Sequence, residues 1–177
     1  MNTFKLLVCL LCLSLAGCAE MGLKPHKPST KNSLEIAKTA GMFQILTIKG
    51  ATPEITKILN SDLMSCGATT FSMPRGNTVG TFVREIFEQE LISAKKLSDH
   101  GTPVEVVIKS MDLSTISKEN GVWTIEIAYT ANDKTTNVKT ITEFESKVSL
   151  LTSCTHTASV FEDTMADNLV EFFNKIR

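Results

Sequence analysis

The chain has 177 residues, and its 18 lysine and arginine side chains nearly balance its 19 aspartate and glutamate side chains. This length suits one domain of ordinary size, and the charge balance argues against a general nucleic-acid-binding protein, which needs a basic face. Beyond the N-terminus, no stretch of the sequence approaches the roughly 18 continuous apolar residues of a membrane span.

The first 18 residues have the pattern of an export signal. Lys5 supplies one positive charge, the apolar run LLVCLLCLSLAG follows, and Cys18 ends it. A short charged region, an apolar core and small residues before a cleavage site describe a secretory signal. The alternatives are a signal anchor and an ordinary secretory signal that happens to contain a cysteine.

The residues Leu15, Ala16, Gly17 and Cys18 resemble the lipobox of bacterial lipoprotein signal peptides. The resemblance implies cleavage before Cys18, a diacylglycerol thioether on its sulfur, and acylation of its new amino group, typically with palmitate. Ala19 stands where an aspartate commonly retains Gram-negative lipoproteins in the inner membrane, so the resemblance implies the periplasmic face of the outer membrane. Two or three acyl chains attach a protein lastingly, because each buried CH₂ contributes about 0.8 kcal/mol.

Only two of the five cysteines remain as a candidate pair. The two cysteines inside the signal leave with it, and Cys18 carries the lipid. Cys66 and Cys154 remain, and an oxidising compartment favours a disulfide between them. The rival interpretation is a metal site at Cys154 and His156, but these supply two ligands where structural zinc needs four. We therefore expect no metal or cofactor.

Residues 19–40 contain two prolines, several lysines and little apolar periodicity. This composition predicts a tether that lifts the domain off the bilayer, with His26 in solvent. The alternative is an ordered N-terminal arm that packs on the domain. The predicted organisation is a signal peptide at 1–17, a lipidated tether at 18–40, and a periplasmic domain at 41–177.

The first half of that domain alternates short strands with helices. Residues 42–50 predict a strand, and Thr52 followed by a proline predicts the start of a helix whose apolar positions extend to Leu63. Residues 68–74 predict a second strand. Asn77 or Thr78 caps a longer helix with an apolar face from residue 79 to residue 94. His100, beside Asp99, falls in a turn.

The second half predicts a three-stranded meander and a final helix. Residues 104–117 and 122–131 flank a hairpin turn at 120–121, and a change of parity near Ser110 predicts a bulge. A turn at 132–137 leads to a third strand, whose alternation continues to Val148 and Leu150. The final helix buries one apolar stripe over residues 158–176 and begins at a capping box formed by Ser159 and Glu162.

This order predicts an α+β fold, with an antiparallel sheet that contains the meander and with helices packed on one face. We expect no enzyme, because the sequence lacks the common catalytic and nucleotide-binding motifs. The paired carboxylates at residues 143 and 145, and at 163 and 167, are predicted to lie in solvent. Catalysis would require His100 or His156 to meet a nucleophile and a carboxylate in one cleft.

The segments FVREIFEQELISA, GVWTIEIAY and FEDTMADNLVEFF, the last after Cys154, resemble a group of small uncharacterised proteobacterial lipoproteins over about residues 66–173. The element order is more loosely similar to that of LptE, YajG and the auxiliary lipoproteins of lipid transporters. The resemblance implies a structural or accessory role in an envelope assembly for transport or biogenesis, with an envelope protein as partner. The alternative is a module that binds a lipid or small ligand between the meander and the helices.

Overall fold

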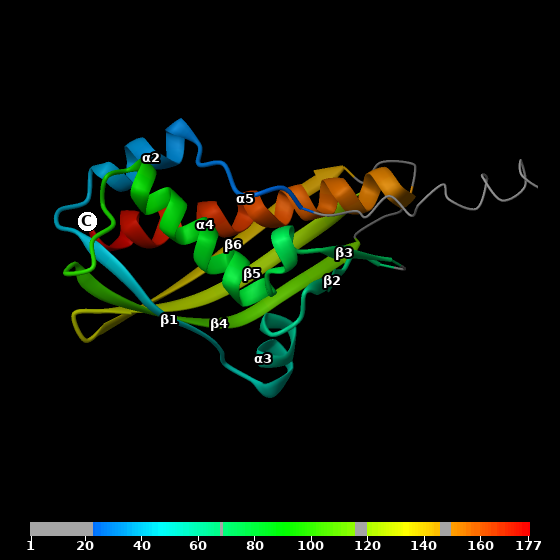
Figure 1. Cartoon of the computed structure of the whole chain (residues 1–177), viewed down its shortest axis with the longest axis horizontal. Coiled ribbons are helices and arrows are strands. Elements are labelled where there is room, and N and C mark those ends of the chain that lie inside the picture. The colour runs from blue at the N-terminus through cyan, green and yellow to red at the C-terminus, as the bar shows by residue number, and fades with distance from the viewer. Residues whose placement is uncertain (1–22, 68, 116–119, 146–149) are drawn as a thin grey trace, which may run out of the picture.

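Figure 1 shows the computed structural model, which describes residues 23–67, 69–115, 120–145 and 150–177. The elements in chain order are α2 (Thr30–Ala37), β1 (Phe43–Gly50), α3 (Pro53–Leu59), β2 (Leu63–Ser65), β3 (Thr70–Ser72), a 3₁₀ turn (Pro74–Gly76), α4 (Val79–Ser93), β4 (Thr102–Thr115), β5 (Asn120–Ala131), β6 (Lys134–Glu145) and α5 (Leu150–Ile176).

The described strands form two sheets. In the larger sheet the order is β1-β4-β5-β6, with β1 parallel to β4 and the other neighbours antiparallel. The smaller sheet pairs β2 with β3. The strands β4, β5 and β6 are the predicted meander, so the α+β prediction is confirmed.

The helices α4 and α5 cover one face of the larger sheet, and α2 contacts both of them (Figure 1). Aromatic contacts join the layers: Tyr129 of β5 stacks on Phe172 of α5 with ring centroids 4.4 Å apart, and Trp123 lies 5.2 Å from Phe161. All four side chains are fully buried. The space between meander and helices is therefore a packed core at these positions, where the ligand-binding alternative expected a cavity.

Several local predictions are confirmed at the level of single residues. Thr52 caps α3 and Thr78 caps α4, each with a side-chain oxygen that accepts a backbone N–H three residues on. The register between β4 and β5 shifts between Ile108 and Ser110, at the predicted bulge. The hairpin turn predicted at 120–121 is wrong, because Asn120 and Gly121 both lie in β5 and pair with β6. The loop before them lies outside the described residues.

Several element boundaries were predicted wrongly. The turn predicted at 132–137 is only two residues long, Asn132 and Asp133, because β6 begins at Lys134 and pairs with β5 from there. Leu63 is not in a helix: α3 ends at Leu59, and the Leu63 N–H donates to the Ser61 hydroxyl at 3.0 Å as the chain turns into β2. The last helix begins at Leu150, so Leu150 is not in a strand and Ser159 caps nothing. Residues 150–158 contain no glycine or proline, and so nothing in them ends a helix. The predicted strand position Val148 lies outside the described residues.

The predicted tether is also wrong from residue 23 onward. Leu23 packs against the core, and its N–H donates to the carbonyl of Ser72, the last residue of β3, at 3.0 Å. Further along, α2 buries Ile36 completely. Residues 23–40 are thus an ordered arm on the domain. In the described part of the chain, no helix has the length and apolarity that crossing a bilayer requires.

Candidate functional site

A buried histidine holds the N-terminal arm against the two large helices. His26 is 8% exposed, although the sequence predicted it in solvent. One ring nitrogen, Nδ1, lies 2.7 Å from Glu162 Oε1 of α5, and Nε2 lies 3.1 Å from Glu90 Oε1 of α4. Nothing in the local sequence indicated this burial, because the two carboxylates that accept hydrogen bonds from His26 lie 64 and 136 residues away in the chain.

The two carboxylates keep His26 positively charged. Burial by itself lowers the pKa of His26, but the hydrogen bonds to Glu162 and Glu90 and their negative charges outweigh burial and raise the pKa to about 9. At neutral pH the imidazolium donates from both nitrogens. The carboxylates lie on opposite sides of the ring, and no group of three described His, Cys, Asp or Glu side chains is arranged to hold a metal ion.

One of these partners gave a signal in the sequence that was overlooked. Glu90 is completely buried, and it follows Ile86 by four residues and Phe87 by three on the apolar stripe of α4. Glutamate is almost never fully buried unless it is paired. The position of Glu90 on the apolar stripe therefore indicates that a positively charged side chain from elsewhere in the sequence packs against it. Its second oxygen, Oε2, has no hydrogen-bond partner among the described residues.

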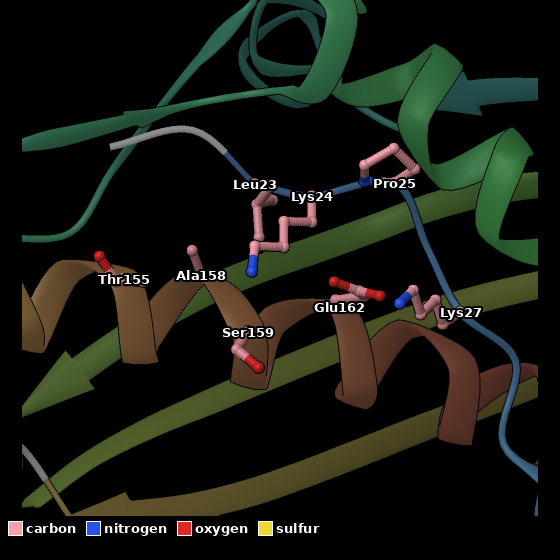
Figure 2. Close-up of a pocket in the computed structure, with 8 residues that line it drawn as sticks. All are labelled: Leu23, Lys24, Pro25, Lys27, Thr155, Ala158, Ser159 and Glu162. Carbon is pink, nitrogen blue, oxygen red and sulfur yellow. The ribbon is translucent and has the colours of Figure 1, made fainter. Parts of the chain in front are cut away.

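A cleft of about 330 Å³ lies beside this cluster, between the arm and α5 (Figure 2). The arm contributes Leu23, Lys24, Pro25 and Lys27, and α5 contributes Thr155, Ala158, Ser159 and Glu162. Figure 2 shows the Lys27 side chain extending toward Glu162. The cleft thus has two lysines on one wall and hydroxyl groups with a carboxylate on the other, and it lies at the first described residues of the chain.

A second, more apolar groove of about 610 Å³ lies beside α3, β2 and the ends of β4 and β5. Its apolar lining comprises Ile58, Leu63, Met64, Met111, Leu113 and Trp123. The bulge near Ser110 helps to build this lining. Met111 and Leu113 pair with Ile125 and Trp123, so they lie on the same face of the sheet as these core residues.

The predicted disulfide between Cys66 and Cys154 is present, with the Cα atoms 5.5 Å apart. It joins the turn after β2 to an early turn of α5, and Cys154 is 1% exposed. Because its sulfur is bonded to Cys66, Cys154 is not a thiolate ligand beside His156. Cys18, the predicted lipidation site, lies outside the described residues.

The other histidines are not brought together. His100 lies exposed in the turn before β4. The His156 ring lies edge-on to the Phe144 ring, with centroids 5.6 Å apart. Glu143 and Glu145 are exposed on β6, as predicted, and so are the two aspartates at positions 163 and 167 on α5.

No family model matches the sequence, and no curated protein matches it. The crystal structure of protein XCC0632 from Xanthomonas campestris, of family-model DUF330, is similar with a TM-score of 0.56 at 7% identity, over 86% of this chain and 90% of that chain. A crystal structure titled only as an uncharacterized protein aligns with a TM-score of 0.46 at 10% identity, over 78% of this chain and 95% of that chain. At these identities the chain shares a fold with XCC0632 and nothing more is shown.

Proposed function

We propose that this chain is an outer-membrane lipoprotein, anchored through Cys18, whose periplasmic domain is a non-catalytic accessory component of an envelope assembly for transport or biogenesis. The observation that carries the proposal is the packed arm. The lipobox cysteine precedes the first described arm residue, Leu23, by only five positions. The lipid and the domain are therefore close neighbours along the chain.

Chain length limits the distance between lipid and domain. A residue spans at most about 3.6 Å, so five residues reach no farther than about 18 Å. A free tether to residue 40 would span several times as much. The arm, the cleft of Figure 2 and the neighbouring β2–β3 sheet are thus held near the membrane. Lys24 and Lys27 in that cleft suit a surface with anionic headgroups.

The disulfide and the histidine placement support the compartment and the non-catalytic role. Disulfides persist in oxidising compartments such as the periplasm, and the pair Cys66–Cys154 closes across 88 residues. His26 is occupied by two carboxylates, His156 lies against the Phe144 ring, and His100 is exposed in the turn before β4. A binding role then falls to the surface, where the apolar groove beside α3 is larger than the cleft of Figure 2.

The same groove favours the alternative function, a periplasmic lipid- or small-ligand-binding lipoprotein. Its volume of about 610 Å³ lies within the range of small-molecule sites. Six apolar side chains in the lining suit an acyl chain. The ligand would then bind beside α3 and β2, because the space between meander and helices is filled by aromatic side chains.

Anchoring is tested by replacing Cys18 with serine and measuring the intact mass and the membrane fraction of the protein. The native chain is expected to lose its first 17 residues, gain the mass of the lipid, and sediment with the outer membrane on a density gradient. Cys12→Ser is the matched control, since it removes a neighbouring signal cysteine without touching the lipobox. Equal masses and fractions for the two variants would contradict the proposal.

The role of the groove is tested with a photo-crosslinking amino acid at Leu63, which lines it and is 47% exposed. Ile92 on α4 is 51% exposed and lies outside the lining, so it is the control position. An adduct with an envelope protein from position 63 alone supports the accessory role. A lipid adduct at that position supports the alternative, and equal adducts from both positions would count against the groove.

A further inference from the structure

The larger sheet has two edges, and they differ in how their backbone is used. At the β1 edge, the Arg84 guanidinium donates to the carbonyls of Ile45 and Leu46 at 2.7 and 2.9 Å, where the register to β4 also shifts. Bulges and capped groups of this kind keep a strand edge from pairing. In the described part of the chain no strand pairs with the other side of β6, which runs for 12 residues.

The hairpin before β6 determines which of its backbone groups face outward. Asn132 and Asp133 have φ values of 50° and 60°, so they form a two-residue type I′ turn closed by the pair Ala131 and Lys134. Hydrogen-bonded pairs alternate from that closing pair onward, and the register continues unbroken to Glu145. The residues whose N–H and C=O groups face away from β5 are therefore those with odd numbers, 135 to 145.

The side chains of the same residues point away from α5. The even-numbered neighbours face that helix: the Thr140 hydroxyl accepts from Asn168 at 3.0 Å, and the Phe144 ring meets His156. Lys139, Ile141 and Glu143 are consequently exposed beside the free edge. Ile141 is 59% exposed, which makes it one of the most exposed large apolar side chains among the described residues.

We propose that β6 pairs antiparallel with β6 of a second copy of this chain, with Ile141 opposite Ile141 of the partner subunit. This places Lys139 opposite Glu143 of the partner subunit, twice by symmetry. Asn137 then lies opposite Glu145 of the partner subunit. All of these residues carry outward-facing backbone groups, so the ladder forms at each of them and joins the two sheets into one.

Other alignments of the two β6 strands are less favourable. Pairing an odd-numbered with an even-numbered residue breaks the ladder, because the even-numbered groups already bond to β5. A shift that centres the pair on Lys139 or on Glu143 sets like charges opposite each other, which is destabilising. Registers centred on Thr140 or Thr142 set Ile141 opposite Lys139 or Glu143, so the two isoleucines no longer meet and an apolar side chain lies against a charged one. Charges on an edge strand ordinarily prevent pairing. Here their spacing about Ile141 brings opposite charges together.

One contact must yield for the outermost pair to form. The Lys175 ammonium donates to the Asn137 carbonyl at 3.1 Å, and it also lies 3.1 Å from Glu171. Lys175 is 41% exposed, and exposed contacts of this kind contribute little. Its side chain can keep the pair with Glu171 while the carbonyl joins the ladder. The inference uses only β6 and its surroundings and is independent of the proposed function.

Cysteine cross-linking tests the register in the full-length protein. Opposed residues in a hydrogen-bonded antiparallel pair have Cα atoms about 5.5 Å apart, within the range of a disulfide. Ile141→Cys is therefore expected to give a disulfide-linked dimer under mild oxidation. Asn137→Cys is the matched control, because its symmetry mate would lie eight residues along the strand, about 27 Å away. Equal cross-linking of the two variants, or none from Ile141→Cys, would overturn the proposal.

Charge reversal provides the second measurement, by sedimentation of the purified full-length protein over a wide concentration range. Lys139→Glu and Glu143→Lys are each expected to weaken dimerisation about tenfold, since each reversal turns two favourable pairs into repulsive ones. The double variant Lys139→Glu with Glu143→Lys restores opposite charges and is expected to recover the native constant. A double variant as weak as the single ones, or a native chain that stays monomeric throughout, would refute the pairing.

Discussion

The His26 cluster permits a quantitative prediction for the substitution His26→Ala. This variant removes the cation between two carboxylates, one of which, Glu90, is completely buried. A buried carboxylate without its partner is strongly destabilising. We therefore expect the variant to unfold far more easily than the native protein, and its arm to become accessible to trypsin at Lys31, which precedes an asparagine.

The magnitude and its pH dependence follow from the raised pKa of His26. A rise from 6.5 to about 9 in the folded protein corresponds to a differential interaction of about 3 kcal/mol. The folded state binds the proton more tightly than the unfolded state. The stabilisation is therefore fully present below pH 6.5, declines as the pH rises from 6.5 to about 9, and is lost above that.

The assay is urea unfolding of the native protein and the variant at several pH values across this window. The native protein is expected to lose about 3 kcal/mol of unfolding free energy between the two ends, while His26→Ala shows no such loss. His100→Ala, at the exposed histidine of the turn before β4, is the control and should follow the native curve. Parallel curves for the native protein and His26→Ala would refute the assigned charge of the cluster.

Three other predictions concern the core and its cross-link. Reducing the bond between Cys66 and Cys154 should lower the unfolding free energy by at most about 4–5 kcal/mol for a loop of this length, as a melt with and without reductant measures. Tyr129→Phe should lower the urea midpoint by an amount equivalent to about 1–3 kcal/mol. The buried phenol donates to Asn168 at 2.8 Å, and its loss leaves the Asn168 oxygen without this donor. An unchanged midpoint would refute this prediction. Gly121→Ala should lower the melting temperature, because the added Cβ would overlap the Phe144 ring of β6. A control Ala substitution at exposed Thr135 should leave the melting temperature unchanged.

Local rules in the sequence were sufficient for much of this fold. A side-chain oxygen that accepts an N–H of the first turn favours a helix start, so Thr52 marked the start of α3 and the pair Asn77 or Thr78 marked that of α4, where Thr78 is the cap. The parity change near Ser110 identified the bulge, because side chains alternate strictly in a strand. The predicted disulfide between Cys66 and Cys154 is present.

The start of α5 needed more than local rules. Apolar residues at 148 and 150 suit a continuing strand as well as a helix, so periodicity alone could not choose between them. In the folded protein, α5 already includes Cys154, whose disulfide to Cys66 ties this part of the helix to the turn after β2. Tertiary contacts of this kind override the weak local preference.

The arm was decided by tertiary structure alone. Composition predicted a tether over residues 19–40, because lysines and prolines without apolar periodicity do not form a core by themselves. Segments far away in the sequence supplied what the arm lacks: two carboxylates for His26 and a backbone acceptor for Leu23. The sequence by itself determined the caps of α3 and α4 and the meander, because each depends on neighbouring residues. The packed arm depends on charges brought together only by folding.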